Sequence, residues 1–175
     1  MIVIAVIGSK KSGKTTTIES LIRGLTNQGY RVATAKHVSE QEFTIDSSGK
    51  DTWRHTQAGA KTVMIVAPQE LAIIKKADTT KLRLQEIVES CQNDIDIVIL
   101  EGFRNLVGHD PAIPKIVSIK RFEEVEEASK RFKTIIAFTG PANLAAKKLD
   151  TPVIDVLESP KKLIEIVKKK LGFGP

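Results

Sequence analysis

A glycine-rich loop near the start of the chain is the feature that most constrains its fold. In the segment "GSKKSGKT", Gly8 and Gly13 are separated by four residues and are followed by Lys14 and Thr15. This spacing is that of a phosphate-binding loop, whose backbone N–H groups surround the phosphates of a nucleotide. Such a loop lies between a buried strand and the first turn of a helix. The flanking residues therefore decide whether the motif is a site or a chance match.

The flanking residues supply this context. Residues 2–7 (IVIAVI) are a short run of apolar, mostly β-branched residues, which indicates a buried parallel strand. Apolar residues then recur at helical spacing over 18–25 until Gly29 ends the pattern, and residues 31–36 (RVATAK) are typical of a second strand. Strand, loop, helix and strand form a βαβ unit, which makes a chance match improbable.

The rest of the chain alternates between predicted strands and predicted helices. Further strands are predicted over 62–67, 71–76, 95–102, 115–119, 134–140 and 152–156. Further helices are predicted over 79–92, 122–132 and 159–171. This alternation predicts an α/β fold of the P-loop NTPase type, a three-layer sandwich with a mostly parallel sheet. Because no composition break marks a second domain, residues 1–175 are predicted to be a single P-loop nucleotide-binding domain.

Composition excludes several classes of protein. No apolar stretch approaches the roughly 20 residues of a membrane span, and basic residues follow the N-terminal apolar run where a signal peptide has them first, so we expect a cytoplasmic protein. The single cysteine, Cys91, excludes an internal disulfide. The net charge is +6, but no aromatic residues interleave the lysines of the segment 160–172. Nucleic-acid binding is therefore not expected.

Each residue of the loop has a predicted role. Gly8 and Gly13 permit the tight turn, and Lys14 reaches the β- and γ-phosphates. Thr15 offers its hydroxyl to Mg²⁺, and Thr16 can contact the α-phosphate.

The remaining loop residues are less constrained. Ser12 precedes the second glycine and is assigned to the nucleotide cradle with the rest of the motif. Lys10 and Lys11 either add positive charge near the phosphates or face the solvent, and the sequence leaves both readings open.

Candidate metal ligands are carboxylates outside the loop. Glu101 ends the strand predicted over 95–102, where open α/β sheets place their ligands. Asp94 and Asp96 lie at the other end of that strand. Asp46 and Asp51, in the irregular segment 37–52, are further candidates for binding the ion directly or through water.

The order of several segments resembles one family. "GSKKSGKTT", "AKHV", "FTIDSSGKDTWRHTQAGA", "ILEGF" and "PKI" together look like the MobB family, the molybdopterin-guanine dinucleotide biosynthesis protein B, from the first strand to about residue 120. The resemblance implies a homodimer that binds GTP with Mg²⁺ and hydrolyses it slowly at best. It also implies that the chain assists the molybdopterin guanylyltransferase (MobA), which attaches GMP to molybdopterin.

The resemblance also assigns site residues. Glu101 and Asp46 would be the catalytic and metal-binding carboxylates, together with the Thr15 hydroxyl. The residues implied to face the nucleotide outside the loop are Lys36, His37, Gly49, Lys50, Asp51 and Gly102. The chain departs from the pattern in two ways: "VSEQE" replaces further histidines of some relatives, and the guanine-reading N-K-x-D string is missing. Residues 139–144 (TGPANL) are the candidate base-contacting loop, with Asn143 as a guess.

Two other functions remain open. A small-molecule kinase that uses ATP shares the βαβ phosphate loop, but its arginine-rich lid has no counterpart among the scattered arginines of this chain. A nucleic-acid-associated ATPase is supported only by the positive charge.

Overall fold

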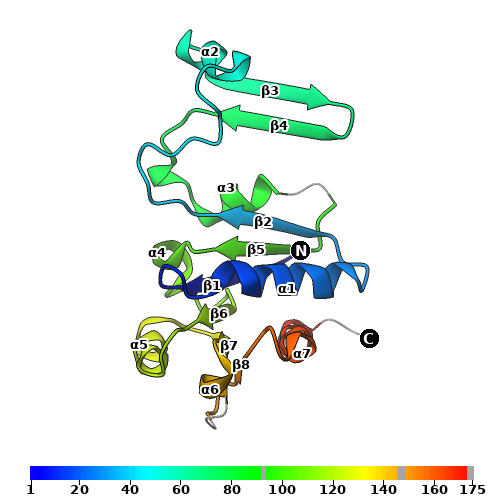
Figure 1. Ribbon diagram of the computed structural model, residues 1–175, viewed down its shortest axis with the longest axis vertical. Coiled ribbons are helices and arrows are strands. Elements are labelled where there is room, and N and C mark those ends of the chain that lie inside the picture. Colours follow the sequence, from blue (N-terminus) through cyan, green and yellow to red (C-terminus); the bar gives the residue numbers. More distant parts are fainter. Residues whose placement is uncertain (92–93, 146–148, 173–175) are drawn as a thin grey trace. The chain divides into compact units, whose positions relative to one another are not determined.

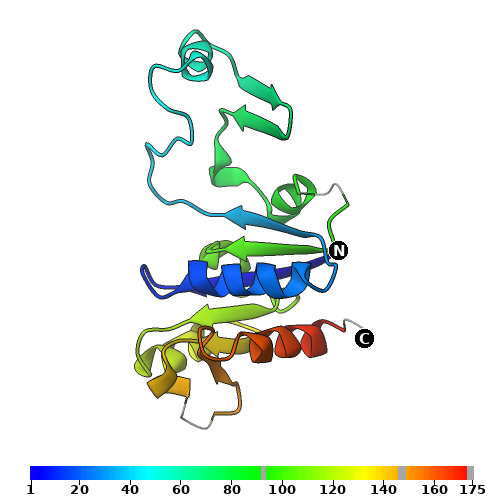
Figure 2. The same cartoon turned by 45° about the vertical axis from the view of Figure 1, so that its right-hand side comes forward.

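The computed structural model describes residues 1–91, 94–145 and 149–172 (Figures 1 and 2). The chain divides into two compact units, one made of Met1–His37 with Arg83–Pro175 and the other of Val38–Leu82. The single nucleotide-binding domain over 1–175 stays a prediction.

The larger unit contains one sheet of six parallel strands in the order β2-β5-β1-β6-β7-β8. The strands are β1 (Ile2–Gly8), β2 (Val32–Lys36), β5 (Ile97–Glu101), β6 (Lys115–Ser118), β7 (Ile135–Thr139) and β8 (Val153–Ile154). The apolar runs seen in the sequence thus become strands buried on both faces, as parallel sheets require.

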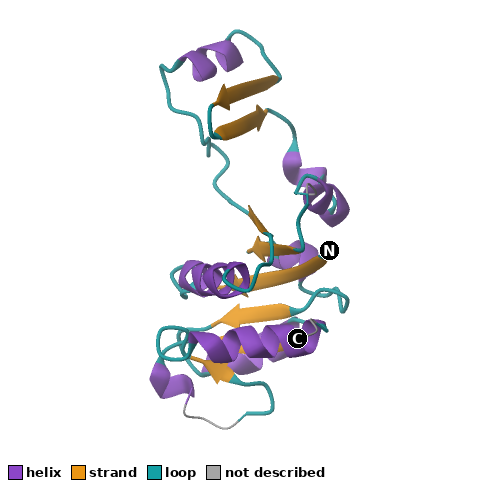
Figure 3. Ribbon diagram, turned by 90° about the vertical axis from the view of Figure 1, so that its right-hand side faces the viewer, coloured by secondary structure: helices purple, strands orange, loops and turns teal. Residues whose placement is uncertain are grey.

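Helices cover both faces of this sheet, as Figure 3 shows. On one face, α1 (Lys14–Thr26) and α7 (Pro160–Leu171) pack side by side on Ile4 and Val6 of β1. On the other face, Ala5 and Ile7 contact the core formed with the remaining helices. These helices are α3 (Leu84–Glu89), α4 (Arg104–Val107), α5 (Glu123–Arg131) and α6 (Ala142–Ala145). The predicted three-layer α/β sandwich with a mostly parallel sheet is confirmed.

All six strands end at the same edge of the sheet. Gly8 at the end of β1 is in register with Ser118 of β6, which is in register with Thr139 of β7. On the other side of β1, Glu101 of β5 is in register with Lys36 of β2. The phosphate loop therefore leaves the middle of this edge, with Glu101 and Lys36 on one side of it.

The smaller unit is built on a hairpin of β3 (Thr62–Ala67) and β4 (Glu70–Lys75), preceded by α2 (Asp51–Gln57). The two strands are confirmed, but they pair antiparallel in a sheet of their own and do not join the parallel sheet. α2 lies in a stretch for which the sequence predicted no helix.

The helix predicted over 79–92 is wrong in its extent. A 3₁₀ turn, η1 (Thr79–Lys81), is followed by extended backbone at Leu82 and Arg83, and only then does α3 begin. The Glu86 carboxylate accepts a hydrogen bond of 3.0 Å from the Arg83 backbone N–H, which fixes the start of α3. Residue 92 lies outside the described residues.

Candidate functional site

The phosphate loop adopts backbone conformations that its sequence allows. Gly13 is the residue before α1 and has a φ of 89°, a left-handed conformation that glycine adopts without strain. Lys11 has a φ of 60°, which is unfavourable for a residue with a side chain and is found preferentially at functional sites. A Cβ added to Gly8 would lie 2.4 Å from the Ser118 carbonyl oxygen, so this position has no room for a side chain.

The loop contains polar groups that a bound anion would satisfy. Within the part of the chain that the structure describes, the buried Ser9 and Ser12 hydroxyls have no hydrogen-bond partner. The Lys14 ammonium group donates a hydrogen bond of 2.7 Å to the Ser9 carbonyl oxygen. Lys10 and Lys11 are exposed, and the choice between a phosphate role and a solvated one stays open.

Positive charge surrounds Lys14. Burial lowers its pKa below the ordinary value, and the nearby Glu101 carboxylate opposes this shift. Arg104, Lys36 and Lys120 lower the pKa further, since each adds a like charge. Four cationic groups thus lie at the mouth of the loop, and Glu101 is the carboxylate that acts on Lys14. Such a cluster favours a ligand that carries several negative charges.

The turn after β5 holds Glu101 in this cluster. The Glu101 side chain is only 15% exposed, and its carboxylate lies 3.2 Å from the Lys36 ammonium group. Its backbone carbonyl accepts a hydrogen bond of 3.0 Å from the His37 N–H. Gly102 and Phe103 then take left-handed conformations, with φ of 84° and 51°, and the Phe103 ring packs 5.4 Å from the His37 ring. The predicted residues Lys36, His37, Glu101 and Gly102 are therefore brought together beside Lys14.

The oxygen donors at the loop fit a hard cation. Thr15, in the first turn of α1, exposes its hydroxyl, and Glu101 supplies a carboxylate at the neighbouring strand end. Among the described residues, no group of three or more His, Cys, Asp or Glu side chains is arranged to hold a metal ion. An ion here would take its other ligands from water and from phosphate oxygens, as Mg²⁺ usually does.

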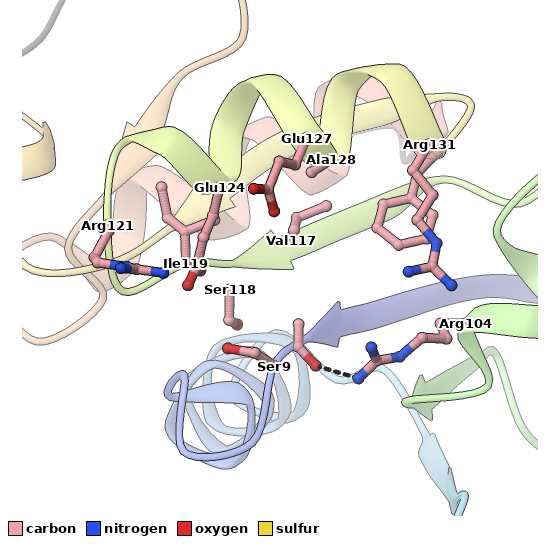
Figure 4. Close-up of a pocket in the computed structure, with 12 residues that line it drawn as sticks. Ser9, Arg104, Val117, Ser118, Ile119, Arg121, Glu124, Glu127, Ala128 and Arg131 are labelled. Atoms are coloured by element: carbon pink, nitrogen blue, oxygen red, sulfur yellow. Dashed lines mark hydrogen bonds between the residues drawn. The ribbon is translucent and has the colours of Figure 1, made fainter.

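Sequence reasoning missed Arg104, which follows the Glu101–Phe103 turn. Its guanidinium group donates a hydrogen bond of 3.1 Å to the Gly8 carbonyl oxygen (Figure 4). A hollow of about 170 Å³ lies beside this contact, between the phosphate loop, the end of β6 and α5. Arg121 and Arg131 also line it, and Arg131 stacks over the ring of Phe132 at 5.3 Å. Glu124 and Glu127 line the hollow as well, and within the described residues none of the three arginines forms an ion pair.

A buried cluster of hydroxyl groups was also missed. The Thr17 hydroxyl is hydrogen-bonded to that of Thr139 at 2.9 Å and lies 3.4 Å from that of Ser118. Ser118 and Thr139 are themselves hydrogen-bonded at 2.9 Å. This cluster ties the first turn of α1 to the ends of β6 and β7. No sequence pattern predicts this cluster, because the three residues are far apart in the chain.

Comparison with known proteins identifies the family. Residues 3–140 match the family described as Molybdopterin guanine dinucleotide synthesis protein B, MobB. The chain belongs to this family. The predicted resemblance is therefore confirmed, and the matched region contains the phosphate loop and the Glu101–Phe103 turn.

Individual relatives agree with the MobB assignment. A putative molybdopterin-guanine dinucleotide biosynthesis adapter protein of Methanocaldococcus jannaschii is 36% identical over 121 residues, which are 69% of this chain and 48% of that protein. The adapter protein of Haemophilus influenzae is 34% identical over 116 residues, or 65% of this chain and 61% of that protein. The chain thus matches roughly half of the length of these relatives. A crystal structure of molybdopterin-guanine biosynthesis protein B superposes with a TM-score of 0.73 at 27% identity, covering 97% of this chain and 99% of that one.

The other predicted MobB site residues lie in the smaller unit. The Asp46 carboxylate accepts hydrogen bonds from the Ser47 N–H (2.9 Å) and the Thr52 hydroxyl (2.8 Å) through Oδ1. Its Oδ2 is buried without a partner among the described residues. Lys50 is the residue before α2, and Asp51 begins that helix.

The nucleotide contacts of Asp46, Gly49, Lys50 and Asp51 stay predictions, as does the metal-binding role of Asp46. No helix of the described ranges has the length and apolar character needed to cross a membrane.

Proposed function

We propose that this chain is a GTP-binding adapter of molybdenum-cofactor biosynthesis. The observation that carries this proposal is the cationic cluster at the phosphate loop, where Lys36, Lys120 and Arg104 lie near Lys14 and Glu101 is the carboxylate that opposes their effect on it. A triphosphate neutralises such a cluster, and its oxygens satisfy the buried Ser9 and Ser12 hydroxyls together with the N–H groups at the start of α1. The names of the relatives support an adapter role.

Each group has a distinct task when the nucleotide binds. Lys14 leaves the Ser9 carbonyl and turns to the β- and γ-phosphates. Thr15 and Glu101 would hold Mg²⁺, directly or through water, and such an ion would supply Lewis-acid stabilisation of charge on the phosphates. Lys36 then neutralises whatever part of the Glu101 charge the ion leaves uncompensated.

Hydrolysis is expected to be slow. Among the described residues, Arg104 is the arginine that hydrogen-bonds the loop, but it donates to the Gly8 carbonyl oxygen at the beginning of the loop. An arginine aimed at the transferring phosphate is worth about 10³–10⁵ in rate. Without one, turnover should resemble that of an unassisted GTPase, about 10⁻⁴–10⁻³ s⁻¹.

The partner in this proposal is the guanylyltransferase MobA, and the second ligand is molybdopterin, both in the cytoplasm. The protein would present or retain GTP or molybdopterin while MobA transfers GMP. The loop that precedes α2, with Lys50, is the proposed contact for the pterin.

The hairpin of the smaller unit supports a homodimer. Met64 pairs with Ile73 and Val66 with Leu71, so all four side chains lie on one face of β3 and β4. They are 57%, 49%, 77% and 61% exposed in that order. An isolated two-stranded hairpin is marginally stable, and an apolar face of this kind marks an interaction site. We propose that a second copy covers it.

Binding by calorimetry tests the function. Charge-assisted hydrogen bonds are worth about 1.5–3 kcal/mol, so Lys14→Ala should weaken GTP binding roughly 10- to 100-fold. Lys169→Ala, which removes an exposed charge near the end of α7, is the control and should bind as the wild type does. Equal affinities for wild type and Lys14→Ala would refute the nucleotide site.

Phosphate release separates the adapter from the ATP-dependent kinase. The adapter should turn over GTP slowly alone, and it should not phosphorylate small acceptors. Turnover above about 1 s⁻¹ with ATP and an acceptor is in the range of kinases and would overturn the adapter proposal.

A further inference from the structure

A second hollow lies at the same edge of the parallel sheet as the phosphate loop. Its volume is about 150 Å³, enough for a planar two-ring base but not for a whole nucleotide. Among the described residues, it is lined by Ala142, Val153, Ile154, Asp155, Glu158, Ser159 and Lys162. These residues come from α6, from β8 and the turn after it, and from the first turn of α7.

The sheet register places this hollow in line with the loop. Gly8, Ser118, Thr139 and Ile154 follow one another across β1, β6, β7 and β8 at the ends of the strands. Three steps of about 4.8 Å between neighbouring strands separate the first residue from the last by about 14 Å. A nucleotide whose phosphates occupy the loop spans a distance of this order between its phosphates and its base. Glu101 lies on the opposite side of β1, so the metal and the base would not compete for space.

The lining of the hollow has the chemistry of a base pocket. The exposed Ala142 offers apolar surface for a ring, while Val153 and Ile154, which are only 5% and 1% exposed, border the hollow from the core. The Asp155 carboxylate accepts a hydrogen bond of 2.9 Å from the Leu157 N–H through Oδ1. Its second oxygen, Oδ2, has no hydrogen-bond partner within the described ranges.

A carboxylate accepts hydrogen bonds and cannot donate them once it is ionised. Guanine presents two adjacent donors, the ring N1–H and the 2-amino group, and its O6 and N7 are acceptors that suit Lys162. Adenine has no 2-amino group and has an acceptor at N1. An ionised Asp155 therefore suits guanine and repels adenine.

We propose that this hollow receives the base of the bound nucleotide and that Asp155 reads guanine through its N1–H and 2-amino group. The inference rests on the proposed GTP binding, and it supplies the guanine selection that the missing N-K-x-D string leaves unexplained. Asn143, the sequence-based guess, lies in α6 and is not among the lining residues that the structure describes. Asp155 is then a specificity-determining residue.

Two measurements of nucleotide affinity test the proposal. With the wild-type chain, ITP, which lacks only the 2-amino group, should bind about tenfold more weakly than GTP. In Asp155→Asn, the amide keeps an oxygen for the Leu157 N–H and presents an N–H₂ donor to the base. GTP affinity should fall at least tenfold, while XTP, which has an acceptor in place of the 2-amino group, should gain by a similar factor. Glu165→Gln, an exposed position on α7, is the matched control and should change neither.

The outcomes separate this inference from the proposed function. If the wild type binds GTP and ITP equally, or if Asp155→Asn weakens GTP and XTP alike, the assignment of Asp155 is wrong although GTP binding stands. If the wild type binds no GTP, the proposed function fails, and the base pocket fails with it. Inorganic triphosphate should bind equally to the wild type and to Asp155→Asn, and a loss there would place Asp155 in the phosphate site.

Discussion

Replacing Thr17 by valine should lower the stability of the nucleotide-free protein. Valine matches the shape of threonine, so the change removes the hydroxyl without opening a large cavity. The lost contacts are the 2.9 Å hydrogen bond to Thr139 and the longer one, 3.4 Å, to Ser118. Ser118 and Thr139 keep their bond to each other, so neither is left fully unsatisfied.

The expected magnitude follows from these contacts. A typical buried hydrogen bond contributes about 0.5–1.5 kcal/mol net. With one good bond and one weak bond lost, the free energy of unfolding should fall by about 1–2 kcal/mol. For a chain of this length, each kcal/mol corresponds to about 2–4 °C in Tm.

Chemical denaturation of four variants tests this reasoning. Thr16→Val, at the neighbouring helical position with an exposed side chain, controls for the helix propensity of valine and should change the free energy of unfolding little. The double variant Thr17→Val with Thr139→Val should lose less than the sum of the single changes, because the two share a bond. Equal stability of Thr17→Val and Thr16→Val, or full additivity in the double variant, would refute the role assigned to the cluster.

Three further predictions concern stability and assembly. The hydrogen bonds with Arg31 lower the pKa of Asp96 from 3.8 to about 2, so the pair stabilises the fold above pH 3.8 and loses this effect as the pH falls to about 2. The difference in the free energy of unfolding between the wild type and Asp96→Asn, measured by denaturation, should therefore disappear over that pH range. Gly8→Ala should destabilise the fold by about 1–3 kcal/mol, because its Cβ meets the Ser118 carbonyl, and denaturant midpoints that match the wild type would contradict this. Val66→Asp should convert the proposed homodimer to monomers in sedimentation, whereas an unchanged mass would show that this face is not the interface.

The fold could be predicted where a single segment carries its own signal. The β-branched run before Gly8, the helical spacing after Lys14 and the strand that ends at Glu101 all depend on neighbours within a few residues. The prediction of one helix over 79–92 was wrong because a capping hydrogen bond can begin a new helix inside a segment whose apolar spacing is continuous. The Arg83 N–H bond to Glu86 starts a new helix inside a pattern that looks continuous.

Contacts between segments that are distant in the chain could not be predicted from the sequence. Arg104 counted as one of several scattered arginines, yet the turn at Gly102 and Phe103 carries it to the Gly8 carbonyl oxygen. Likewise, β3 and β4 form their own sheet because they pair with each other. A strand has the same apolar pattern whether it joins this hairpin or the parallel sheet. A predicted strand therefore says little about which sheet it joins.

The shared direction of the six strands separates two kinds of residue in space. At the starting edge of the sheet, Arg31 and Asp96 join the beginnings of β2 and β5; nearer the middle, where Lys115 is in register with Ala5 of β1, the buried Lys115 ammonium group donates hydrogen bonds to the backbone carbonyls of residues 110 and 113. The Arg31–Asp96 pair lies a full strand length of β1 from the phosphate loop. Stabilising substitutions that keep this pair can therefore be sought along the starting edge without disturbing the chemistry at the other edge.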